Sequence, residues 1–238
     1  MRVLYIKKKW IALLPIFIIA LGYILRINNS VTPTFYLPVT NKVIAIDAGH
    51  GGIDPGAAGQ LEKKEDDINL EIALKLRKLI EQNGGVVILT RDEDVGLYTD
   101  DSKTIREKKN EDLRNRKALV NDSNPDVFLS IHLNSFTQKQ YYGAQTFYKK
   151  GCESSKKLAE LIQEEFKNSL DKDNNRVPQS RDSLYLIREV EKPSVLIECG
   201  FLSNSNEEKL LNSEKYQEKI AWSIYIGLIK YFNEIEQK

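Results

Sequence analysis

Apolar residues recur along the chain with two different periods, one typical of strands and one typical of helices. Short runs rich in β-branched residues are bounded by turn residues, whereas longer segments repeat apolar side chains every three or four positions. Within residues 66–82, Ile68, Ile72 and Leu76 share one helical face, and Asn83 ends the pattern. The predicted strands are Val43–Asp47, Val86–Thr90, Asp126–His132, Ala144–Tyr148, Ser183–Arg188 and Ser194–Glu198, and the predicted helices are Asp66–Gln82, Asp112–Asn121, Ser154–Leu170 and Tyr216–Phe232.

Strands that alternate with helices in this way predict an α/β fold. We expect a three-layer α/β/α domain with a largely parallel mixed sheet, preceded by an N-terminal hydrophobic helix. Sheets of this kind bind their ligands beyond the carboxyl ends of the strands. Residues that follow those ends are therefore the first candidates for a functional site.

The N-terminus differs from the rest of the chain. Residues 10–25 carry no charge between Lys9 and Arg26, and as a helix they would span roughly 24 Å. That length lies between a signal-peptide core and a membrane span, and a buried soluble helix is the remaining alternative. We expect residues 1–26 to be an N-terminal signal or membrane anchor that is not cleaved, 27–41 a linker, and 42–238 the folded domain. The basic residues before the run direct the domain outward, so the protein is expected to be exported and either membrane-anchored or secreted.

Charge and cysteine content exclude several classes of function. Lys and Arg number 35 against 34 Asp and Glu, and this balance gives no electrostatic footprint for nucleic acid. Two cysteines do not form a disulfide framework. Cys199 follows an apolar run and is expected to be a small buried side chain. The alternative, a cysteine nucleophile, would need a neighbouring base.

Residues 92–116 form a stretch dense in charges of both signs and poor in apolar side chains. We expect a solvated loop that leads into an exposed helix start. The alternative is a mobile flap near the site that contacts the substrate or a partner protein.

The chain contains only two histidines, and both lie where a predicted strand ends. His50 follows the first strand and His132 ends the third. Two imidazoles and one carboxylate are a ligand set that suits catalytic zinc, with a fourth position left for water. Glu65 is a candidate for the carboxylate, although Glu62, Asp66 and Asp67 compete with it, and any of these acids could simply complement the helix dipole.

Glu198 is a carboxylate at the end of an apolar strand, where burial is costly unless the group is paired or close to a metal. The functional interpretation makes it a general base that takes a proton from water and passes it to a leaving amine. The ordinary alternative is a buried acid paired with Lys or Arg. Asp47 could orient the His50 loop or stabilise a turn, and Asn134 could position a substrate carbonyl or cap the loop.

Several motifs, in order, resemble the zinc-dependent N-acetylmuramoyl-L-alanine amidases of the Amidase_3 family. They are IAIDAGHGGIDPGA, KEDDINLEIALKL, VVILTR, LRNRKALVN, FLSIHLNS and SVLIECGFLSNSNEEKLL, and the likeness covers about Lys42 to Phe232. In the second motif, Asp66 replaces the Lys that is usual in the family. The resemblance implies that His50, Glu65 and His132 bind one Zn²⁺ and that Glu198 is the general acid and base. The implied reaction is hydrolysis of the amide between N-acetylmuramic acid and L-alanine in peptidoglycan.

Within the family, the chain is most similar to the germination-specific amidases of spore formers, through the N-terminal segment and the blocks GAQTFYKKG and LYLIREVEKPSVLIE. This likeness implies removal of stem peptides from spore cortex, so that muramic-δ-lactam can form with a cooperating deacetylase. It also implies a location between the forespore membranes, membrane contact through the N-terminal segment, and an accessory exported protein that aids zinc binding or activity. The alternatives are a zinc peptidase acting within wall peptides, for which Arg91 or Arg188 could hold a terminal charge, and a non-catalytic wall-binding protein.

Overall fold

The computed structural model describes Pro15, residues 37–61 and residues 63–236. It divides into two units, 1–36 and 37–238. The expected anchor of residues 1–26, the question of its cleavage and the acid Glu62 therefore lie outside the described residues, apart from Pro15. Among the helices that are described, none has the length and apolarity needed to cross a membrane.

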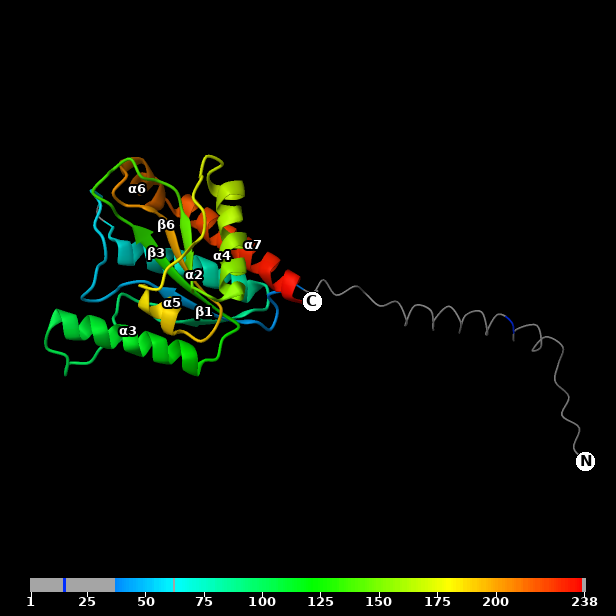
Figure 1. Ribbon diagram of the computed structural model, residues 1–238, viewed down its shortest axis with the longest axis horizontal. Helices are drawn as coiled ribbons and strands as arrows, with labels where there is room; N and C mark the ends of the chain where they lie inside the picture. Colours follow the sequence, from blue (N-terminus) through cyan, green and yellow to red (C-terminus); the bar gives the residue numbers. More distant parts are fainter. Residues whose placement is uncertain (1–14, 16–36, 62, 237–238) are drawn as a thin grey trace, which may run out of the picture. The chain divides into compact units, whose positions relative to one another are not determined.

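A six-stranded mixed sheet forms the centre of the domain (Figure 1), in the order β2-β1-β3-β6-β4-β5. The first four strands in this order are parallel, β4 is antiparallel to β6, and β5 is parallel to β4. The strands are β1 (Val43–Ala48), β2 (Val86–Leu89), β3 (Val127–Asn134), β4 (Gln145–Tyr148), β5 (Gln179–Ser180) and β6 (Ser194–Phe201). The predicted largely parallel mixed sheet is confirmed.

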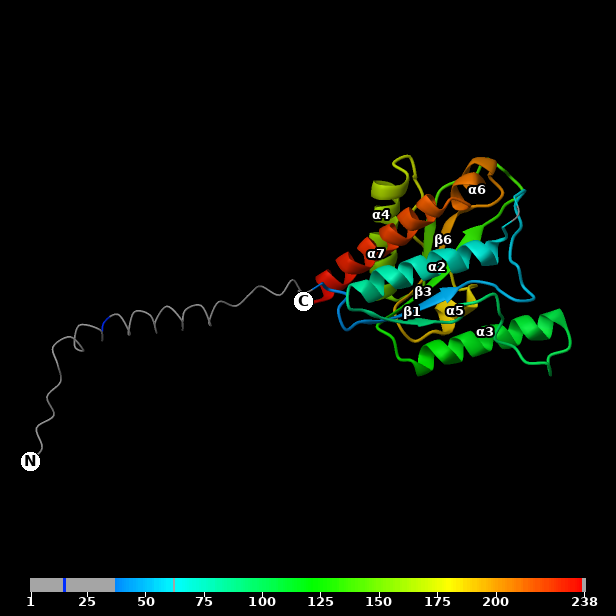
Figure 2. The ribbon, with the colours of Figure 1, turned by 180° about the vertical axis from the view of Figure 1, so that it is seen from behind.

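Helices cover both faces of this sheet (Figures 1 and 2), as the predicted three-layer arrangement requires. The larger apolar core joins one face to α2 (Glu65–Gln82), α4 (Glu153–Glu165) and α7 (Glu214–Glu236). The smaller core joins the other face to α3 (Ile105–Asp122) and α5 (Tyr185–Glu189). Fully buried side chains such as Ile46, Ile72 and Leu129 each contribute about 1.5–3 kcal/mol through burial.

Residues 183–188 do not form the predicted strand. A turn leads into α5, whose Leu186 and Ile187 pack in the smaller core against Phe128 and Leu196 of the sheet. A short apolar run has no periodicity that separates a strand from one buried helical turn, and tertiary packing decided between them here. The short β5, α6 (Ser205–Leu211) and the π-helical turn η1 (Phe166–Leu170), which ends the predicted helix 154–170, were also not predicted.

Helix α3 begins at Ile105, earlier than the predicted start at Asp112, so much of the charged segment is helical rather than loop. Thr104 and Glu107 form a capping box in which each side chain accepts the other residue's backbone N–H. These two bonds satisfy N–H groups at the start of the helix that have no partner within it. A Thr followed three residues later by Glu was the sequence signal for this start.

The domain begins before residue 42. Residues 37–41, which we assigned to the linker, pack with the domain, and Val39 is fully buried in the larger core. A Cβ on Gly85 would lie 3.2 Å from the Val39 side chain, so the chain entry and the turn after α2 pack closely.

Candidate metal and catalytic site

The register of the sheet places His132, Glu198 and Gln145 side by side on β3, β6 and β4. Paired residues on neighbouring strands share a face, and every second residue along a strand does so too. Phe128, Leu196 and Phe147 lie two or four residues away on the same strands and pack in the smaller core. The row that contains His132 and Glu198 therefore lies on the α3 and α5 face of the sheet.

His50 reaches this row through a tight loop after β1. Its backbone has a positive φ of 65°, and Gly51 and Gly52 follow with φ of 120° and 61°. L-residues with side chains rarely adopt this region, so the conformation is held by surrounding contacts. The N–H of Gly51 donates to the carbonyl of Asp54 at 2.8 Å, and Asp54 Oδ2 lies 3.0 Å from Nδ1 of His50. The Asp54 carboxylate fixes the ring so that its Nε2 lies toward Glu65.

Glu65 is the first residue of α2, and it joins the two histidines. Its Oε1 lies 3.2 Å from His50 Nε2 and 3.1 Å from His132 Nδ1. One ligand atom from each of the three residues lies within 4.8 Å of the other two. The same carboxylate accepts the N–H of Ala57 at 2.8 Å and of Leu133 at 3.1 Å. Glu65 is thus fixed by the loop after β1 and by β3, and the structure brings together the three residues that the resemblance named as ligands.

The electrostatics of this trio favour a positive charge. Burial lowers the pKa of His50, but hydrogen bonds to Asp54 and Glu65 outweigh it and raise the pKa to about 10. Burial works to raise the pKa of Glu65, and the two histidines nevertheless hold it well below its usual range. Such a site stabilises a cation. Two imidazoles and one carboxylate are donors that zinc prefers, so the residues fit a zinc ion.

Glu198 has an unsatisfied carboxylate oxygen beside this trio. Its Oε2 is buried and has no hydrogen-bond partner among the described residues. Burial raises the pKa of Glu198 to about 7, against the opposing attraction of His132. A buried acid paired with Lys or Arg would instead have its oxygens satisfied and its pKa depressed. The geometry therefore favours the general-base interpretation over the structural one.

Two buried arginines donate hydrogen bonds to the backbone carbonyls of the His50 loop. Arg116 of α3 donates to Asp47 Oδ1 at 2.8 Å, to the carbonyl of Ala48 at 2.9 Å and to the carbonyl of His50 at 2.7 Å. Arg91 donates to the carbonyls of Ala48 at 2.8 Å and Gly49 at 3.1 Å. Together they satisfy the carbonyls of a loop that forms no regular structure.

Asp47 supports the His50 loop through Arg116, and among the described residues its hydrogen bonds go to other side chains than the two imidazoles. Its oxygens accept from Thr90 Oγ1 at 2.7 Å and Ser130 Oγ at 2.6 Å, in addition to Arg116. Burial works to raise the pKa of Asp47, but the attraction of Arg116 and His132 and the hydrogen bonds from Ser130 and Arg116 outweigh it and lower the pKa to about 2. Asp47 therefore stays ionised and anchors Arg116.

The other predicted site residues lie in different settings. Arg91 is only 3% exposed, and its guanidinium bonds to backbone carbonyls. Asn134 ends β3 with a partly buried side chain, and its carbonyl accepts from Leu202. Cys199 is fully buried in the larger core, on the opposite face from Glu198, and burial raises the pKa of its thiol. The expectation that Cys199 is a small buried side chain is confirmed.

The charged segment touches the site through its loop. The N–H of Gly52 donates to Asp94 Oδ1 at 2.7 Å, and the N–H of Ile53 donates to the Tyr98 hydroxyl at 3.2 Å. On α3, the Lys109 ammonium lies 2.8 Å from Asp54 Oδ1. Sequence reasoning missed Asp54, Lys109 and Arg116. The signal for Arg116 was an arginine in the same helical period as Leu113 and Val120.

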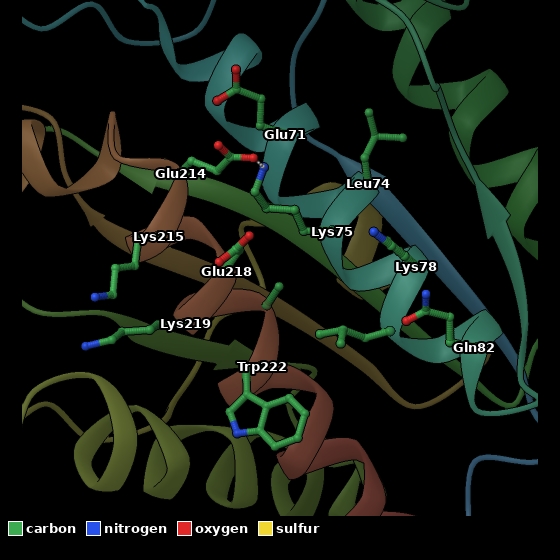
Figure 3. A pocket seen from close by; sticks show the side chains of 12 residues that line it. Glu71, Leu74, Lys75, Lys78, Gln82, Glu214, Lys215, Glu218, Lys219 and Trp222 are labelled. Atoms are coloured by element: carbon green, nitrogen blue, oxygen red, sulfur yellow. Dashed lines mark ion pairs between the residues drawn. The ribbon is translucent and has the colours of Figure 1, made fainter.

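A small cavity of about 160 Å³ adjoins His50 and His132 and is lined also by Asp54, Lys109 and Leu186. A much larger cavity, of about 780 Å³, lies between α2 and α7 (Figure 3). Lys75 and Glu214, which pair at 3.9 Å, and Trp222 line it. Neither histidine lines this larger cavity, so the candidate metal site adjoins the smaller cavity and not the larger one.

Comparison with known proteins identifies the family of the chain. Residues 44–230 match the family Amidase_3, described as N-acetylmuramoyl-L-alanine amidase. The germination-specific N-acetylmuramoyl-L-alanine amidase of Bacillus subtilis (strain 168) is 40% identical over 231 residues, which cover 96% of each chain.

Solved structures give the same result. The CwlD amidase from Clostridioides difficile, solved in complex with the GerS lipoprotein, is 58% identical with a TM-score of 0.80, over 82% of this chain and 100% of that chain. The catalytic domain of CwlV from Bacillus (Paenibacillus) polymyxa var. colistinus is 31% identical with a TM-score of 0.68, over 81% and 98%. The chain belongs to the Amidase_3 family of N-acetylmuramoyl-L-alanine amidases.

Proposed function

We propose that the protein hydrolyses the amide between the lactyl group of N-acetylmuramic acid and L-alanine in peptidoglycan. The observation that carries this proposal is the convergence of His50, Glu65 and His132 within 4.8 Å, with Glu198 in register beside His132. Family membership supports the choice of bond, because the same residues lie in the motifs that define the resemblance.

The proposed cofactor is one zinc ion held by His50, Glu65 and His132. When bound, zinc would supply Lewis acidity that polarises the scissile carbonyl and acidifies water. The residues around it orient the ligands: Asp54 fixes the His50 ring, and the N–H groups of Ala57 and Leu133 fix Glu65. Partners of this kind set the tautomer and direction of a metal ligand.

Glu198 is the proposed proton carrier. With a pKa near 7, its carboxylate can accept a proton from the attacking water and release it to the departing amine of L-alanine. Its Oε2 has no other hydrogen-bond partner to give up before it does so. The absence of a competing bond in the described residues keeps the base available.

We also propose that the substrate is spore cortex peptidoglycan. The germination-specific relative supports this assignment, and removal of stem peptides would allow a cooperating deacetylase to complete muramic-δ-lactam. The proposed location is the space between the forespore membranes, with residues 1–26 as anchor. The GerS complex of the C. difficile relative supports an accessory exported protein as partner.

A zinc peptidase acting on a chain end fits the structure less well. Such an enzyme needs a cation to hold the terminal carboxylate, and the two candidates were Arg91 and Arg188. Arg91 is enclosed beneath the His50 loop, and Arg188 pairs with Glu189 at 2.7 Å. Neither arginine lines the cavity beside His50 and His132.

The test is to incubate the zinc-loaded domain with cortex-type peptidoglycan and to identify the products by mass spectrometry. The proposal expects free stem peptides that begin with L-alanine and glycan strands with bare lactyl groups. Fragments cut between amino acids would assign the site to a peptidase, and unchanged peptidoglycan would assign the protein to wall binding.

A further inference from the structure

Aromatic side chains gather at the rim of the sheet, beyond the ends of β3 and β6. Phe136 and Tyr141 pack edge to face, with ring centroids 5.4 Å apart, and both contact the ring of Phe201. Phe201 is fully buried, whereas Phe136 is 45% and Tyr141 is 42% exposed. Two large rings in contact with each other and open to solvent form a surface, not a core.

Arg176 extends this surface. Its guanidinium lies 4.5 Å from the centroid of the Phe201 ring, Nε donates to the carbonyl of Tyr142 at 2.7 Å, and Nη1 donates to Gln145 Oε1 at 2.9 Å. Stacking and two hydrogen bonds fix the plane of the guanidinium, so little further order is lost when it binds a ligand. We call Phe136, Tyr141, Phe201 and Arg176 the aromatic platform.

The loops that carry the platform are anchored by polar side chains. Phe136 N–H donates to Ser203 Oγ at 3.1 Å, Asn204 Nδ2 donates to the Tyr141 carbonyl at 3.3 Å, and Gly143 N–H donates to Glu207 Oε1 at 2.9 Å. Glu207 Oε2 also accepts the N–H of Phe201 at 2.9 Å. The platform is therefore preformed.

The platform is continuous with the catalytic row. Gln145 is the direct neighbour of Glu198 across β4 and β6, and it is also the residue that Arg176 contacts. One side chain thus separates the proposed base from the platform. When the scissile bond of a polymeric substrate lies at Glu198, the rest of the polymer must extend beyond the site. The aromatic platform is a preformed surface on which the neighbouring part of the polymer can bind.

The charge around the platform argues for an uncharged ligand. A cavity of about 260 Å³ beside Tyr141 and Arg176 is lined also by Gln140, Asp173 and Asn175. Glu207 acts on Arg176 electrostatically and offsets its charge. Asp173 would repel the carboxylates of a stem peptide, whereas amides and one guanidinium suit hydroxyl and acetamido groups. The volume lies just below the range of about 300–1,000 Å³ that is typical of small-molecule sites, so the cavity suits a small ligand or one unit of a polymer.

We propose that the aromatic platform is a glycan subsite, which binds an N-acetylated sugar of the peptidoglycan strand next to the muramic acid being processed. The apolar face of the pyranose ring would stack on Tyr141 and Phe136, and Arg176 would donate to its oxygens. This inference rests on the proposed function only in its choice of polymer. It assigns a binding role to residues that the chemistry does not use.

The test measures binding of peptide-free glycan strands, built from N-acetylglucosamine and N-acetylmuramic acid, to the zinc-loaded domain by calorimetry. Because these strands hold no scissile amide, the readout does not depend on turnover. We expect Tyr141→Ala and Phe136→Ala each to weaken binding roughly three- to tenfold. Trp222→Ala, which removes a ring 49% exposed on α7, is the matched control and should bind as the parent does.

Each outcome decides the inference. Thermal melting of each variant confirms that the fold is intact, and Tyr141→Phe should restore binding if stacking is the cause. No binding of peptide-free strands, equal loss in Trp222→Ala, or variants that weaken only the binding of free stem peptide would each overturn the subsite. Binding that depends on the platform in a protein that releases no peptide would keep the subsite and refute the proposed amidase activity.

Discussion

Arg116 donates a hydrogen bond to the backbone carbonyl of His50 and not to the imidazole ring. Nη2 of Arg116 donates to the His50 carbonyl at 2.7 Å, while Nη1 bonds to Asp47 and Nε to Asp112. The residue is 1% exposed, and the attraction of Asp47 and Asp112 outweighs burial and raises the pKa of its guanidinium further. The positive φ of His50 is therefore maintained by a charged side chain from a helix that begins 55 residues later, at Ile105.

Replacing Arg116 by Lys should weaken zinc binding. An ammonium keeps the charge but cannot reach two carbonyls and two carboxylates in one plane. Loss of an outer partner of a metal ligand typically costs about 10- to 100-fold in metal affinity, and we expect a loss in that range for Arg116→Lys. Competition with a chelator of known affinity measures it. Arg114→Lys, on the exposed side of the same helix, is the control. Equal zinc affinity in both variants would show that the loop holds its conformation without Arg116.

The choice of Glu65 from a cluster of acids can be tested by comparing it with Asp67. Glu65→Gln removes a charged oxygen that lies between the two histidines, so we expect stoichiometric zinc binding to be lost. Asp67→Asn, two residues along α2, is exposed and keeps an oxygen that can accept the N–H of Lys64. Metal analysis of both purified variants decides the matter. Zinc retained in Glu65→Gln, or lost in Asp67→Asn, would remove Glu65 from the ligand set.

The pH dependence of turnover follows from Glu198. A general base works only as a carboxylate, and burial raises the pKa of this group to about 7. We expect kcat/KM to fall as the pH drops through the folded-state pKa. A cation on the histidines would favour the carboxylate and move this midpoint below about 7. A pH profile on soluble muropeptides measures the effect. An increase in kcat/KM on going from about pH 7 to about pH 5 would contradict a role for Glu198 as base.

Much of the site was accessible from the sequence because parallel strands share an edge. His50 follows one apolar run, and His132 and Glu198 were expected to end two others, so strand assignments alone brought them near the carboxyl ends of parallel strands. In the structure β3 continues to Asn134 and β6 to Phe201, so His132 and Glu198 lie within paired strands, on one face of the sheet. Periodicity alone could not select Glu65 from its neighbours, because each acid at a helix start complements the dipole equally well. The resemblance supplied that choice.

The support beneath the site was not accessible in this way. Arg116 contacts the His50 loop from 66 positions away, and such a contact is set by how α3 packs on the sheet. The helical period showed an arginine where an apolar residue would be usual, but not its partners. The prediction of a strand at residues 183–188 was wrong for a related reason. Leu186 and Ile187 can be buried equally well in a strand or in one helical turn, so the sequence pattern did not separate the two.

The most direct test of the account concerns Glu198 and the metal together. In one preparation of Glu198→Gln, zinc content and the release of stem peptides from peptidoglycan are both measured against the parent protein. The account predicts one zinc per domain, as in the parent, with peptide release reduced at least about 100-fold, because the proton carrier is lost and the ligands are not. Parental peptide release by a zinc-loaded Glu198→Gln protein would contradict it.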